Sequence, residues 1–130
     1  MTTALYASLS AFFIFWLSMN VIKKRRLYKV SLGDGGNEEL RTAIAAHLNA
    51  VEYIPITLLL LFALEYNKAN VWLLHGLGLV FIIGRIIHAR GLLQARLKIR
   101  VMGMQITLYI LIALGILNII YLPYGQLFRF

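Results

Sequence analysis

Residues 4–22 read ALYASLSAFFIFWLSMNVI, a run of 19 residues without a charged side chain. At about 1.5 Å per residue, a helix of this length spans about 30 Å, the thickness of the hydrocarbon core of a bilayer. No basic residue precedes the run, and five follow it closely: Lys23, Lys24, Arg25, Arg26 and Lys29. A cleavable signal peptide has the opposite order, so we expect this segment to stay in the protein as a membrane-spanning helix.

The composition of the whole chain is also that of a membrane protein. Of its 130 residues, 61% are hydrophobic, against about 45–50% in soluble domains. The formal net charge is +8, but the basic residues lie in short segments between apolar runs, where they orient a membrane protein. We therefore expect membrane lipids around the chain and no nucleic-acid partner. The chain has no cysteine, so thiol chemistry would need a thiol brought by a ligand.

Three more apolar segments follow the first. Spanning helices are predicted over four ranges, about 4–22, 38–64, 71–93 and 101–122. Asn37, followed by Glu38 and Glu39, is a typical N-terminal cap for the second helix, and Pro123 helps to end the fourth. The predicted fold is an all-α integral membrane protein, a bundle of four transmembrane helices in a single membrane domain, residues 1–130.

The basic residues are unevenly distributed among the connections. Residues 23–29 and 90–100 hold most of them, whereas the short connection at 65–70 holds only Lys68. Basic connections stay on the cytoplasmic side of a membrane. We therefore expect both chain termini on the outer side.

Polar residues interrupt the second and third predicted helices. At 100° per residue, one set falls within a sector of about 80° on the second helix: Arg41, Ala45, Asn49 and Glu52. Arg85 and His88 form a shorter stripe on the third helix. A carboxylate in a spanning helix is costly, so Glu52 is expected either to pair with Arg85 as a structural bridge or to line a cleft open to the cytoplasm. The three histidines are not spaced like metal ligands, and no metal site is expected.

Three strings of residues are distinctive in their order and spacing: RRLYKVS at 25–31, HLNAVEYIP at 47–55 and GRIIH at 84–88. Together they resemble the membrane-associated proteins in eicosanoid and glutathione metabolism, the MAPEG family, and especially its bacterial branch. The resemblance covers nearly the whole chain. It implies a homotrimer of four-helix bundles in the bacterial inner membrane, with glutathione bound between neighbouring subunits near the cytoplasmic face.

The same resemblance assigns site residues. It implies that Arg100, at the start of the fourth helix, is the catalytic arginine that stabilises the glutathione thiolate, with Arg96 as a second candidate. The residues implied in glutathione binding are Arg25, Arg26, Arg41, Asn49, Glu52, Tyr53, Arg85 and His88. Glutathione carries an ammonium, two carboxylates, amides and a thiol, which carboxylate, guanidinium and amide side chains can recognise.

Two positions depart from the well-studied eukaryotic members of that family. Ala45 stands where they have an arginine, and Leu92 where they have a tyrosine. The expected function is that of a glutathione-dependent transferase or peroxidase acting on lipophilic electrophiles. A non-catalytic membrane scaffold or lipid-binding member of the family is the alternative, and Ala45 favours it. A small four-helix multidrug transporter is disfavoured, because residues 4–22 lack the carboxylate that such proteins carry in their first helix.

Overall fold

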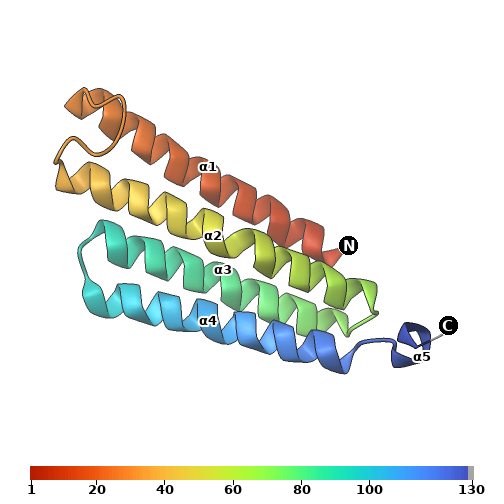
Figure 1. The fold of residues 1–130 in the computed structure, drawn as a ribbon. Helices are drawn as coiled ribbons and strands as arrows, with labels where there is room; N and C mark the ends of the chain where they lie inside the picture. Colours follow the sequence, from red (N-terminus) through yellow and green to blue (C-terminus); the bar gives the residue numbers. More distant parts are fainter. Residues whose placement is uncertain (129–130) are drawn as a thin grey trace.

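The computed structural model describes residues 1–128, which form four long helices and one short one. The helices are α1 (Thr2–Tyr28), α2 (Glu38–Tyr66), α3 (Val71–Leu93), α4 (Leu97–Ile120) and α5 (Tyr124–Leu127). The four long helices run up and down beside one another (Figure 1). The α1–α2 and α3–α4 connections lie together at one end, here called the basic end. The N-terminus, the α2–α3 connection and α5 lie at the other.

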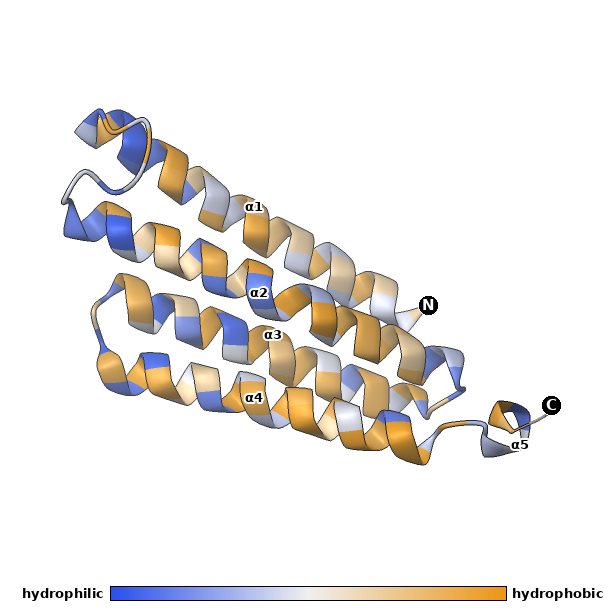
Figure 2. Cartoon of the chain, viewed as in Figure 1, coloured by the Kyte–Doolittle hydropathy of each residue, from blue (hydrophilic) through white to orange (hydrophobic). Residues whose placement is uncertain are grey.

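The four long helices are each long and apolar enough to cross a membrane. Hydrophilic residues gather at the basic end, whereas apolar residues dominate the rest of the helices (Figure 2). The prediction of an all-α, multi-pass membrane protein with four transmembrane helices is confirmed.

Two helices extend by at least one turn beyond the predicted spanning segments. Helix α1 does not stop before its basic residues but continues through them to Tyr28, and Lys29 ends it with a left-handed backbone, φ 54°. Helix α4 begins at Leu97 and not at Val101, so Arg100 lies in its first turn. Lysine and arginine are good helix formers, and their long side chains can reach the lipid headgroups from a helical backbone, so charge alone did not mark the ends.

Side chains cap the N-termini of three helices by accepting hydrogen bonds from backbone N–H groups. Asn37 Oδ1 accepts a hydrogen bond from Leu40 N at 2.9 Å, which confirms the predicted cap of α2. Asn70 Oδ1 does the same for Trp72 N at the start of α3, at 2.8 Å. The carboxylate of Glu65, near the end of α2, accepts from Thr3 N at 2.8 Å and from Thr2 N. It therefore caps α1 from a different helix.

Helices α3 and α4 approach each other at backbone distance. A Cβ built on Gly103 would lie 2.3 Å from His88 N, and one built on Gly91 would lie 2.2 Å from Arg100 N. A Cβ on Gly84 would lie 2.6 Å from the side chain of Ile106. Small residues permit this kind of approach in membrane bundles, where close packing replaces the hydrophobic effect as the driving force.

Helices α2 and α3 lie at the centre of the arrangement. Each contacts the other three long helices, whereas within residues 1–128 α1 and α4 do not contact each other. Two apolar clusters fill the interior, one nearer the basic end and one nearer the N-terminus. The first contains Leu17, Ala46, Ala50, Ile54, Phe81, Ala89 and Leu92, and the second Tyr6, Leu61, Leu64, Leu74 and Leu114.

Candidate functional site

Arg85 is the polar centre of the bundle. Its side chain is almost fully buried, with 1% of the residue exposed. Its Nη2 donates to Asn49 Oδ1, its Nη1 donates to Thr107 Oγ1 at 3.3 Å, and its Cζ lies 5.7 Å from the ring centroid of Tyr53. One guanidinium thus joins α2, α3 and α4 through neutral partners and a cation–π contact.

The structure does not form the predicted bridge between Glu52 and Arg85. Glu52 is exposed on α2, and within residues 1–128 it takes part in no ion pair. Asn49 and Glu52 are about 60° apart around the helix axis, and the helix is rotated so that Asn49 is the one that faces Arg85. Of the two alternatives for Glu52, the bridge to Arg85 is therefore not formed, because position on a stripe does not fix which member of it meets the neighbouring helix.

His88 lies one turn after Arg85 and faces α4. It is buried, and its Nδ1 lies 3.0 Å from the carbonyl oxygen of Arg100. A carbonyl oxygen only accepts hydrogen bonds, so Nδ1 carries the proton and donates it. The histidine is therefore bonded to the backbone of the arginine predicted to be catalytic.

Two adjoining grooves open along α4 at this level. The larger, about 550 Å³, is here called the α2–α4 groove, and its lining consists of Asn49, His88, Leu97, Arg100, Val101, Met104, Gln105 and Leu108. The smaller, about 180 Å³, runs toward the basic end and is lined by Glu38, Thr42, Gly91, Leu92, Ala95, Leu97 and Arg100. Both share Arg100, whose side chain is exposed and thus stands where they meet.

The structure brings only some of the predicted site residues together. Asn49, Tyr53, Arg85, His88 and Arg100 form one connected set around the α2–α4 groove. Arg96 does not line either groove; it precedes α4 beside a separate surface hollow.

The remaining arginines lie elsewhere at the basic end. Arg25 donates to Gly33 O at 2.8 Å and so holds the loop after α1 in place. Arg26 is exposed. Arg41 is also exposed, and its Nη1 lies 3.5 Å from a carboxylate oxygen of Glu38. Within a single chain, these three residues do not enter the α2–α4 groove.

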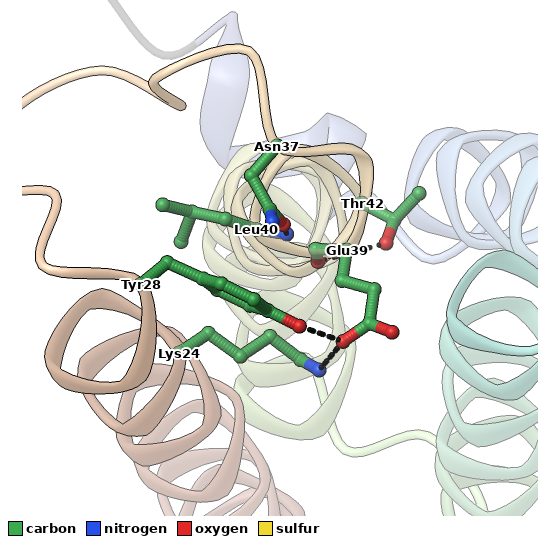
Figure 3. A network of polar contacts seen from close by, with 6 residues as sticks. All are labelled: Lys24, Tyr28, Asn37, Glu39, Leu40 and Thr42. Carbon is green, nitrogen blue, oxygen red and sulfur yellow. Dashed lines mark hydrogen bonds and ion pairs between the residues drawn. The ribbon is translucent and has the colours of Figure 1, made fainter.

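A second polar cluster at the basic end ties α1 to α2. Glu39 Oε2 accepts from Tyr28 Oη at 2.7 Å and from Lys24 Nζ at 3.3 Å (Figure 3). Asn37, the cap of α2, lies beside them. These contacts fix the position of the α1 end relative to α2, and they use one of the basic residues that the sequence had suggested only for topology.

Three site residues were missed in the sequence. Gln105 and Thr42 line the grooves, and Thr107 accepts from Arg85. The sequence did contain a signal for Gln105, namely a stripe of residues at helical spacing. The α4 residues that line the larger groove recur every three or four positions: Leu97, Arg100, Val101, Met104, Gln105 and Leu108. Thr107 lies in an otherwise apolar run and gave no comparable signal.

Comparison with known protein families shows where a chain with four membrane-length helices and this polar centre belongs. The MAPEG family pattern matches residues 3–120, and the chain belongs to that family. Inner membrane protein YecN of Escherichia coli strain K12 is 40% identical over 128 residues, which cover 98% of both chains. The YecN protein of Escherichia coli O6:H1 strain CFT073 is similar to the same extent. The chain is a multi-pass protein of the inner membrane.

Proposed function

We propose that this protein is a glutathione-dependent transferase or peroxidase that acts on lipophilic electrophiles. Glutathione would bind in the α2–α4 groove, at the level of Arg100. The observation that carries the proposal is the position of the exposed Arg100 guanidinium. It stands at the junction of two grooves, and the larger of them is lined by both amide and apolar side chains.

The groove suits part of a glutathione molecule. Its volume of about 550 Å³ falls within the range of small-molecule sites, about 300–1,000 Å³. Asn49 and Gln105 offer amide groups for the peptide bonds of the ligand, and Glu38 in the adjoining groove offers a carboxylate for its ammonium. Among residues 1–128, Arg100 is the one guanidinium that lines the α2–α4 groove.

Two carboxylates and a thiolate need more positive charge than Arg100 alone supplies. In a homotrimer, the basic end of α1 in a neighbouring copy would bring Arg25 and Arg26 to the open side of the groove. The same contact would cover Glu52, which is costly to leave facing lipid. We therefore propose that the complete site forms between subunits.

Different side chains of the protein would have different roles in the reaction. When bound, glutathione would supply a thiolate that attacks either an electrophilic carbon or a peroxide oxygen of the substrate. The bond from that atom to the leaving group breaks, and the leaving group departs with the bonding electrons. Arg100 stabilises negative charge at the sulfur atom. Val101, Met104 and Leu108 give the groove an apolar wall for the hydrocarbon part of a substrate that enters from the bilayer.

The test is ultraviolet difference spectroscopy of the purified protein in detergent on addition of glutathione. Wild type should show thiolate absorbance at neutral pH, and Arg100→Met should lose it while still binding the tripeptide. Arg96→Met is the matched control, because Arg96 is exposed and does not line the groove. An unchanged thiolate signal in Arg100→Met, or its loss in Arg96→Met, would assign activation to a different residue.

A second candidate function, that of a non-catalytic scaffold or lipid-binding family member, is favoured by the position of Ala45. This residue is partly buried against the apolar cluster near the basic end and does not line either groove. The well-studied eukaryotic members of the family have an arginine at this position, and Ala45 supplies no guanidinium there. Absence of glutathione binding at millimolar concentration would support this alternative.

A further inference from the structure

His88 and Arg100 are connected through the backbone of α4. Nδ1 of His88 donates to the carbonyl oxygen of Arg100 at 3.0 Å, and only 3% of the histidine is exposed. One ring nitrogen is thus committed to α4, although the ring also contributes to the wall of the α2–α4 groove.

Glycines hold the same two segments together. Backbone atoms of Arg100 would lie 2.2 and 2.6 Å from a Cβ on Gly91, and those of His88 would lie 2.3 and 2.6 Å from a Cβ on Gly103. The first turn of α4 is therefore pressed directly against α3 on both sides of the hydrogen bond. This restrains a helix end, which without such contacts frays.

We infer that His88 is a positioning residue that sets the direction of the Arg100 side chain in the groove. This inference rests on the proposed function of Arg100. It gives His88 a role different from the ligand contact that the sequence implied. A guanidinium that stabilises a thiolate must be held close to the sulfur atom. The hydrogen bond from His88 to the Arg100 carbonyl fixes the rotation of the first turn of α4, which carries this guanidinium.

The test compares two substitutions in purified, detergent-solubilised protein. His88→Asn places an amide N–H where Nδ1–H stands, whereas His88→Leu has similar bulk and no donor. The probe is glutathione, and two quantities are measured: its dissociation constant and the thiolate absorbance per bound molecule. We expect His88→Leu to lose about tenfold in thiolate at neutral pH, as is usual when a group that orients a working residue is removed. Its affinity should change far less.

His88→Asn should restore most of the thiolate signal. On an Arg100→Leu background, His88→Leu should have no further effect, because the histidine acts only through that arginine. An equal loss of affinity and thiolate in His88→Leu would overturn the inference in favour of a ligand contact. Should His88→Leu fail to fold, His88→Ala, which also lacks the donor, replaces it.

A measurement without glutathione separates this inference from the proposed function. The Nε–Hε nuclear magnetic resonance signal of Arg100, assigned by its loss in Arg100→Lys, should be single and narrow in wild type and in His88→Asn. In His88→Leu it should broaden or move to the position of a free side chain. If wild type neither binds glutathione nor shows thiolate, the proposed function fails. An unchanged Arg100 signal in His88→Leu would then overturn the positioning role on its own.

Discussion

Arg85 is an internal cation whose hydrogen-bond partners are neutral. Asn49→Leu would remove one acceptor from a buried guanidinium, so we expect the free energy of unfolding to fall by about 1–3 kcal/mol. Unfolding in mixed detergent micelles, followed by circular dichroism, measures this value. The double variant Asn49→Leu with Arg85→Met should recover much of the loss, because it removes the donor as well. Additive losses in the double variant would contradict this account.

Substitution of Glu52, unlike that of Asn49, is expected to have little effect on the stability of a single chain. Because it is exposed in the single chain, Glu52→Gln should change the stability of dissociated protomers by no more than about 0.5 kcal/mol. Lys23→Gln, an exposed change at the basic end, should behave alike. In the assembled protein, however, only Glu52→Gln should weaken glutathione binding. This is checked by calorimetric titration of both variants, and matching affinities would remove Glu52 from the site.

Sequence reasoning at this scale found the right residue types but not all of their contacts. It placed Asn49, Arg85 and His88 near one another, and the structure agrees. It left open whether Glu52 pairs with Arg85 or lines a cleft, and a rotation of α2 by about 60° decides that Asn49, and not Glu52, meets Arg85. That rotation depends on the packing of three helices at once, which no single segment of sequence contains.

The contact between α3 and α4 predicts a sharp difference between two glycines of the same helix. A Cβ on Gly103 would lie 2.3 Å from His88 N, whereas a Cβ on Gly115 would meet no atom of residues 1–128 within 4 Å outside the nearby backbone of its own helix. Gly103→Ala should therefore force the helices apart and cost at least about 1–3 kcal/mol. Gly115→Ala should be neutral or stabilising by up to about 1 kcal/mol. Thermal unfolding in detergent measures both, and similar values for the two would mean that the helices do not touch there.

The helices themselves were largely readable from the sequence. The start of α2 followed from Asn37 and the acidic residues after it, and both ends of α3 agree with the prediction. The last residue of α1 and the first residue of α4 lie beyond the predicted segments, because hydropathy marks where a chain leaves the hydrocarbon and not where the helix stops. As a result, Arg100 lies in the first turn of α4 and not in the connection before it.

The whole molecule makes a prediction about topology. The α1–α2 and α3–α4 connections lie at the same end (Figure 1), and they carry most of the basic residues. Both termini should therefore lie on the outer side of the inner membrane. Alkaline phosphatase fused after residue 130 should be active, and a fluorescent protein that matures only in the cytoplasm should stay dark there. The reverse pattern would turn the groove to the outer side.

The central claim is that copies of this chain assemble to complete a glutathione site beside Arg100. Native mass spectrometry in several mild detergents, with glutathione added up to millimolar concentration, tests it most directly. We expect a trimer that takes up as many as three glutathione molecules, and Arg100→Met should keep the trimer while losing thiolate absorbance. A monomer in every detergent, or a trimer that takes up no glutathione, would contradict the claim.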